Sequence, residues 1–311
     1  IRSGGSRENF LPLGSMTTAD SMRPRTQPTP HPTSPQRAAT RTAPRFKSRR
    51  DWLSNEPGAW AIVLMPTLSA LFVCGPTLAL CWVAVAWACC YCVQFSAARW
   101  FKSRFRTRYA APTLTYLGAL AVIGVPFVVL HPGVLRWAPL YIVLTAGSML
   151  GAWMRREHSL WANACAVLAS SAMPLVMQPY GAHAIPAMQL AGNTLPSTHN
   201  WFPAGTFAQP ALTLSLAYAA MLGGSVLFVK TMIRERGNRA YLAASWIWHI
   251  VICAVGFAVS PWLGAAGALL LLRAIGLPLI ARMRRVPAKY TGITECVAST
   301  LCFVLITCAA I

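Results

Sequence analysis

The chain has 311 residues, of which 56% are hydrophobic and only 11% are charged, and its formal net charge is +20. Soluble globular domains are roughly 25% charged, so this composition excludes an ordinary soluble domain, as does the mean hydropathy of +0.49. Whether the positive charge indicates a nucleic acid partner depends on where the basic residues lie along the chain.

Residues 1–56 are rich in Pro, Ser, Thr and Arg and show no hydrophobic period. Such a composition cannot bury enough apolar surface to form a core. The sequence therefore predicts a disordered, basic cytoplasmic tail over 1–56, followed by a transmembrane helical domain over 57–311. No apolar run at the start resembles a secretory signal.

The remaining residues contain nine apolar runs, each close to the roughly 20 residues that a helix needs to cross a bilayer. They predict an all-α, polytopic transmembrane helical bundle of about nine spans. Internal prolines are expected to be tolerated, because neighbouring helices can satisfy the freed carbonyl groups. The predicted spans are 58–75, 77–97, 113–131, 135–153, 159–177, 211–229, 241–259, 262–281 and 293–311, with prolines at Pro66, Pro126, Pro174 and Pro278.

The distribution of charge predicts the orientation. If the tail is cytoplasmic, 25 of the 27 Lys and Arg residues lie on the inner side, whereas 178–210 contains no charged residue. The positive-inside rule then places the N-terminus inside and the C-terminus outside a cell (plasma) membrane, which we expect to be a bacterial inner membrane. Anionic inner-leaflet lipid is the expected partner of these residues, and nucleic acid is not. The exceptions are Arg136 in an outer loop and Arg273 inside a span.

Polar residues within the spans gather toward the predicted inner half. His249 lies about 12 Å into its span, at 1.5 Å per residue, and Arg273 lies similarly deep. A charged side chain at such depth is costly unless it is paired or hydrated. Arg273 is therefore expected either to pair with a carboxylate, to reach the inner surface, or to line a functional cavity. The candidate residues of a cytoplasm-facing polar cavity are Arg273, His249, Asn163, Glu157, Glu295 and Gln94.

The segment "VKTMIRERGNR" at 229–239 offers contacts for anionic head groups, namely Lys230, Arg234 and Arg236. His249 alone is more typical of a hydrogen bond to a neighbouring helix, with Ser245 one turn away, than of a catalytic base. No nucleotide-binding, zinc-protease or serine-hydrolase motif is present. The catalytic residues therefore stay unknown, and no metal or cofactor is predicted.

Two short patterns favour packing over chemistry. Cys89 and Cys92 form a C-x-x-C, but it lies inside an apolar run, where small apolar packing is favoured over a redox or metal role. Gly147 and Gly151 form a G-x-x-x-G, which lets two helices approach closely. In a bundle of many spans this pattern favours internal packing over dimerisation.

Four stretches carry a family resemblance: "EPGAWAIVLMP" (56–66), "REHSLWANA" (156–164), "VKTMIRERGNRAYLAASWIWH" (229–249) and "KYTGITE" (289–295). Together they resemble the YwiC-like family of bacterial multi-pass membrane proteins, from about residue 53 to the end. The resemblance implies a membrane location and carries no established biochemical activity. The chain departs from the family at Pro57, where His is usual, and at Ala164, where an acid is expected.

The predicted architecture is also similar to that of UbiA-type prenyltransferases. Their Asp-rich motifs hold Mg²⁺ and a diphosphate, whereas the aspartates here are Asp20 and Asp51, both in the tail. Three functions stay open. The chain is predicted to transport a small or amphiphilic solute, to act as a non-catalytic membrane partner or assembly protein, or to modify a lipid or isoprenoid as a membrane-embedded enzyme. The oligomeric state and any small-molecule or membrane-protein partner are not predicted.

Overall fold

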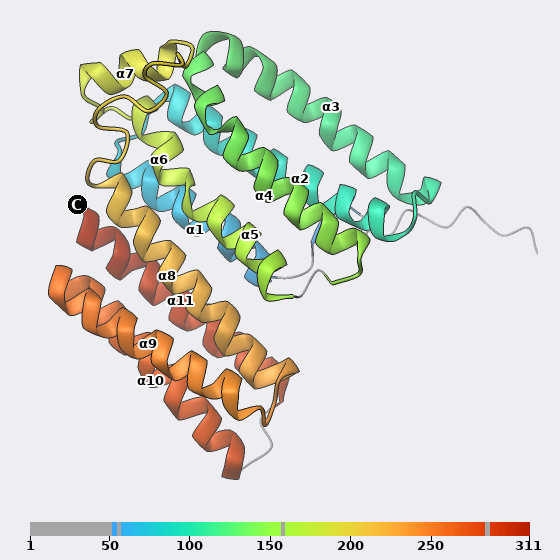
Figure 1. Cartoon of the computed structure of the whole chain (residues 1–311), viewed down its shortest axis with the longest axis vertical. Coiled ribbons are helices and arrows are strands. Elements are labelled where there is room, and N and C mark those ends of the chain that lie inside the picture. The colour runs from blue at the N-terminus through green and yellow to red at the C-terminus, as the bar shows by residue number, and fades with distance from the viewer. Residues whose placement is uncertain (1–51, 55–56, 157–158, 284–286) are drawn as a thin grey trace, which may run out of the picture. The chain divides into compact units, whose positions relative to one another are not determined.

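The computed structural model describes residues 52–54, 57–156, 159–283 and 287–311, which all belong to one compact unit, Phe46–Ile311. The described residues form an antiparallel helical bundle (Figure 1). Its elements are α1 (Pro57–Val73), α2 (Leu78–Lys102), α3 (Thr107–Leu130), η2 (Pro132–Trp137), α4 (Ala138–Trp153), α5 (Leu160–Ser171), α6 (Met173–Met177), η3 (Gln178–Tyr180), α7 (Pro186–Asn193), α8 (Ala211–Val229), η4 (Lys230–Arg234), α9 (Arg239–Val259), α10 (Pro261–Met283) and α11 (Ala288–Ala310).

Within these residues, eight continuous helical segments are long and apolar enough to cross a membrane, and α1 is an apolar helix of 17 residues. The predicted polytopic helical bundle is thus confirmed, and the protein is a multi-pass membrane protein. Pro66, Pro126 and Pro278 lie inside helices as expected. Pro174 instead follows a break, because α5 ends at Ser171 and the short α6 begins at Met173. The tail of 1–51 lies outside the described residues.

The buried centre of the bundle is formed by α1, α5, α8 and α11, of which α1 and α8 each contact the other three. Leu214, Tyr218 and Phe228 of α8 are completely buried. In Figure 1, α3 lies at one edge of the bundle and the pair α9–α10 at the opposite edge. Many outward-facing side chains of these edge helices are large and apolar, which is the surface that a surrounding bilayer requires.

The basic residues gather at one end of the bundle, here called the basic end, which is formed by the α2–α3, α4–α5, α8–α9 and α10–α11 connections (Figure 1). The other end, here called the cap end, carries α7 and the C-terminus. This segregation follows the predicted alternation of inner and outer loops. The described Lys and Arg residues of the basic end are Arg99, Lys102, Arg104, Arg106, Arg108, Arg155, Arg156, Lys230, Arg234, Arg236, Arg239, Arg282 and Lys289.

Close packing explains the short patterns of the sequence. A Cβ atom on Gly147 would lie 2.9 Å from the Sγ of Cys165, and one on Gly151 would lie 3.0 Å from the Cβ of Ala162. The G-x-x-x-G therefore brings α4 against α5 within one chain, as predicted. Each of the ten cysteines, all of them among the described residues, is free, and Cys89 donates a weak bond to the carbonyl of Tyr116 at 3.6 Å.

Candidate functional site

A cavity of about 1440 Å³ runs through the bundle beside α1. Its lining on α2 extends from Val83 to Phe101, which at 1.5 Å per residue spans about 27 Å of helix. The hydrocarbon core of a bilayer is about 30 Å thick. The cavity therefore follows most of the length that a membrane-spanning helix covers, from the basic end toward the cap end.

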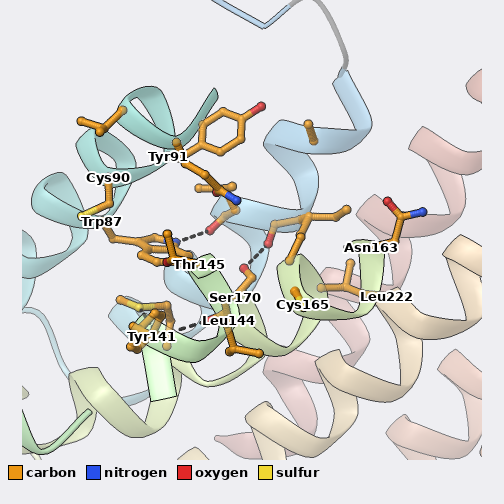
Figure 2. Close-up of a pocket in the computed structure, with 18 of the residues that line it drawn as sticks. Trp87, Cys90, Tyr91, Tyr141, Leu144, Thr145, Asn163, Cys165, Ser170 and Leu222 are labelled. Carbon is orange, nitrogen blue, oxygen red and sulfur yellow. Dashed lines mark hydrogen bonds between the residues drawn. The ribbon is translucent and has the colours of Figure 1, made fainter. Parts of the chain in front are cut away.

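Most of the cavity wall is apolar, including its aromatic residues. The indole Nε1 of Trp87 donates to the Val63 carbonyl at 3.2 Å, and the Tyr141 hydroxyl donates to the Ala169 carbonyl at 2.9 Å. Ser170 likewise donates its hydroxyl proton to the carbonyl of Ile62. Figure 2 shows these bonds, by which backbone carbonyls satisfy the donors of Trp87, Tyr141 and Ser170. The wall therefore offers mainly carbon surface to an occupant.

The cavity is open on the α3 side. Its lining residues on this helix include Leu117, Val125 and Val129, which are 49%, 59% and 72% exposed. Among the helices of the described bundle, α3 packs chiefly on α2 and stands apart at the edge (Figure 1). Side chains that both line the cavity and remain this exposed mark an opening toward the surrounding hydrocarbon.

The polar part of the wall lies at the basic end, where Lys230, Arg234 and Glu295 line the cavity. Lys230 is only 8% exposed, and its Nζ lies 5.6 Å from the ring centroid of Tyr241. Arg234 is exposed. Within the described part of the chain, neither cation forms an ion pair with a carboxylate. The mouth of the cavity therefore carries two positive charges that no described acidic side chain neutralises.

Arg273 lies behind this wall, with 5% of its surface exposed. Its Nη1 donates to the Oε2 of Glu295, and its guanidinium lies 4.2 Å from the ring centroid of Phe228. Its Nε and Nη2 atoms have no hydrogen-bond partner among the described residues. Of the expected alternatives for Arg273, pairing with Glu295 is therefore the one that the structure contains.

His249 is fully buried and does not line the cavity. Its Nδ1 lies 2.6 Å from the Ser245 carbonyl, so this nitrogen carries the proton and donates it, within the histidine's own helix and not to a neighbouring helix as expected. Nε2 is left without a partner in the described structure. Gly224 permits the imidazole to approach α8, because a Cβ there would lie 3.0 Å from Nε2.

The six predicted cavity residues therefore divide into groups. Gln94, Asn163 and Glu295 line the cavity, and the Nε2 of Gln94 donates to the Ser148 hydroxyl at 2.8 Å. Arg273 and His249 are buried outside it, and Glu157 lies outside the described residues. Of the predicted head-group contacts, Lys230 and Arg234 line the cavity, whereas Arg236 is exposed and does not.

The apolar body of the cavity was not predicted. It depends on small side chains that leave space between helices, such as Ala97, Ala166 and Ala169, each of which lines the wall. Alanine is frequent in every span, so its frequency alone does not locate a cavity. The cavity face of α2 also carries large side chains such as Trp87 and Tyr91, so no run of small residues marked the cavity in the sequence.

The position at which the chain departs from the expected family pattern on α5, Ala164, is exposed and does not line the cavity. The other departure, Pro57, begins α1. An acid at position 164 would therefore lie outside the wall described above.

Comparison with known proteins agrees with the sequence motifs. The model of the YwiC-like protein family matches residues 53–178. An uncharacterized protein of Haemophilus influenzae is 23% identical over 261 residues, which cover 83% of this chain and 98% of that relative. No solved structure matches the chain. The chain is therefore similar to the YwiC-like proteins, and the family match of 53–178 contains two of the four motifs, those at 56–66 and 156–164, whereas the resemblance was predicted to extend to the end of the chain.

Proposed function

We propose that this protein transports an amphiphilic solute through the cavity beside α1. The observation that carries the proposal is the length of the cavity, which follows about 27 Å of α2 between Val83 and Phe101. A pocket that serves a small ligand typically measures 300–1,000 Å³, and this cavity exceeds that range. A long apolar chain would occupy such a volume.

The chemistry of the wall supports an amphiphile over a fully water-soluble solute. Trp87 and Tyr141 present carbon surface, whereas Lys230 and Arg234 place charge at one end of the cavity. An occupant with an apolar chain and a polar head matches both parts of the wall. The opening beside α3 gives such a molecule a route from the hydrocarbon layer.

The lateral opening beside α3 also favours a second function, the modification of a lipid by a membrane-embedded enzyme. Transport is preferred because the described cavity wall has one carboxylate, Glu295, and that group is already paired with Arg273. General acid–base catalysis needs a group free to exchange a proton with the reacting atom. A purely structural assembly protein would gain nothing from so large an interior cavity.

The location follows from the same proposal. A plasma membrane, with the basic end toward the cytoplasm, would place Lys230 and Arg234 beside anionic inner-leaflet lipid. The head group of a lipid in that leaflet would then meet the mouth of the cavity, and its chain would enter beside α3.

Transport can be tested with a matched pair of variants on α5. Ala166 lines the cavity, whereas Ala164 faces outward. Proteoliposomes would contain a chain-labelled fluorescent lipid, and transfer between leaflets would be measured by quenching from outside. We expect the unchanged protein to accelerate transfer, Ala166→Phe to abolish the acceleration, and Ala164→Phe to preserve it. Equal transfer by the two variants would contradict transport through this cavity.

Profiling the lipids and metabolites of a deletion strain separates the two functions. A transporter predicts that one amphiphile accumulates chemically unchanged on one side of the membrane. Loss of a modified lipid together with accumulation of its precursor would instead support the enzyme.

A further inference from the structure

We infer that the solute carries a phosphate-type anionic head group and that Lys230 and Arg234 bind this group at the mouth of the cavity. The inference rests on the proposed function, because it assigns the substrate class of the same cavity. It depends on three features of the wall, which are the burial of Lys230, the geometry of the segment that holds both cations and the net charge of the mouth.

The first feature is the burial of a cation. Lys230 is 8% exposed and lines the cavity near one end of a membrane-spanning helix. A buried ammonium group is unfavourable unless an anion or water accompanies it. Among the described residues, its Nζ lies 5.6 Å from the ring centroid of Tyr241, and a ring face attracts a cation without neutralising it. An anionic occupant of the cavity would supply the missing charge.

The second feature is the geometry of the segment that holds both cations. Lys230–Arg234 is a π-helical turn that continues α8, and the Glu235 amide donates to the Lys230 carbonyl at 2.8 Å. Residues four apart lie on one helix face, so Lys230 and Arg234 both reach the cavity. Turns of this type are rare and occur frequently at functional sites.

The third feature is the net charge. Glu295 lies in the same wall, but Arg273 behind it neutralises the carboxylate. In the described wall this leaves two uncompensated positive charges, those of Lys230 and Arg234. A phosphate monoester carries about −1.5 to −2 at pH 7, whereas a carboxylate carries a single charge. A planar guanidinium and a lysine ammonium together are also a common way to hold phosphate oxygens.

The pairing of Arg273 with Glu295 therefore helps the cavity to select an anionic head group over a neutral one. An unpaired Glu295 carboxylate would reduce the attraction of the mouth for an anion. Because Arg273 holds it from behind, the mouth stays positive and favours an anionic head over a neutral one. Arg273 acts here through Glu295 and is a positioning residue.

Lipid binding by the full chain in phosphatidylcholine nanodiscs tests the inference. The probes are phosphatidic acid, diacylglycerol with the same chains, and inorganic phosphate, and retained lipid is counted by native mass spectrometry. The unchanged protein is expected to retain phosphatidic acid at least about tenfold better than diacylglycerol. Lys230→Met and Arg234→Gln are each expected to lower that affinity about tenfold or more, since one charged hydrogen bond corresponds to roughly this factor.

Two controls accompany these variants. Lys230→Arg keeps the charge and is expected to keep most of the binding. Lys289→Met removes a charge from the basic end at an exposed position outside the cavity, and it is expected to change the affinity less than about twofold. The Met side chain in Lys230→Met retains the apolar stem, and Arg234 is exposed, so loss of binding by both variants does not reflect loss of folding.

The outcomes separate this inference from the proposed function. Equal retention of phosphatidic acid and diacylglycerol would overturn the head-group assignment, and so would unchanged binding by both Lys230→Met and Arg234→Gln. If Ala166→Phe still lost retained lipid in those cases, the cavity would remain the binding site of an amphiphile. If inorganic phosphate bound as tightly as phosphatidic acid, the site would bind a free anion, and the assignment of its ligand as a lipid would be overturned.

Discussion

The two ends of the bundle use buried cations in opposite ways. At the cap end, Arg136 is 5% exposed, and its guanidinium donates to the carbonyls of Gly133 at 2.8 Å and Ala191 at 2.5 Å. At the basic end, Lys230 is similarly buried, but its contact within the described part of the chain is the ring of Tyr241 and no carbonyl acceptor. The difference shows that burial of a cation alone does not identify a binding site. The proposed site at Lys230 depends in addition on its position in the cavity wall.

The cap end is also closed by further contacts. The indole of Trp201 donates to the Arg136 carbonyl at 3.0 Å, and the imidazole Nδ1 of His131 lies 2.6 Å from Asn193 Oδ1. The rings of Trp137 and Phe202 pack with centroids 5.3 Å apart and planes tilted by 58°. These bonds fix the uncharged connection against the helices. The basic end instead leaves the mouth of the cavity open.

The largest expected effect comes from the ion pair behind the cavity. Arg273→Leu leaves the Glu295 carboxylate without its partner at the wall. Breaking a buried pair by removing one member costs about 3–5 kcal/mol. Unfolding in a mixed-micelle denaturant titration would measure the loss, with the exposed Arg282→Gln on the same helix as a control near zero. If Arg273→Leu/Glu295→Leu were no more stable than Arg273→Leu alone, the pair would not be the cause.

A smaller effect is expected at the cap end. Arg136→Met leaves the carbonyls of Gly133 and Ala191 without their donor, which costs about 2–3 kcal/mol. Lipid retention by the cavity should not change, because Arg136 lies outside it. The same titration and the nanodisc assay measure the two quantities. A loss of retained lipid in this variant would show that the two ends are not independent.

The smallest effect concerns the polar cluster that joins α1, α8 and α11 in the cap half. The Ser69 hydroxyl lies 2.5 Å from that of Tyr218 and 2.6 Å from that of Thr307. Tyr218→Phe should lower the unfolding free energy by about 0.5–1 kcal/mol, the usual contribution of one such bond between membrane helices. Tyr290→Phe, at an exposed ring, is the matched control. If the two variants had the same unfolding free energy, the hydroxyl cluster would not contribute to stability.

Hydropathy predicted the spans better than the helix ends. The second helix runs to Lys102, five residues past the expected 97, and α3 begins at Thr107, six residues before the expected 113. Apolar runs mark the hydrocarbon layer, whereas a helix continues into the interface through basic residues. The short α7 was missed, because it does not cross the membrane and has no long apolar run.

The candidate site was predicted in part, for a similar reason. The depth of Arg273 indicated that it needs a partner, and the structure supplies Glu295. His249 has the same polarity and depth but faces Ser245 and α8, away from the cavity. Sequence periodicity gives the depth and face of a residue on its own helix. It does not give the neighbours of that face, so it could not separate these two residues.

The proposed function requires that the charged mouth of the cavity opens on the cytoplasmic side of a bilayer. Single cysteines at two exposed positions, His199→Cys in the cap-end connection and Arg236→Cys at the basic end, test it most directly. An impermeant thiol reagent applied to intact cells, with the unchanged chain as background, should label His199→Cys at once. Arg236→Cys should be labelled only after permeabilisation, and the reverse pattern would contradict the orientation on which the proposed function depends.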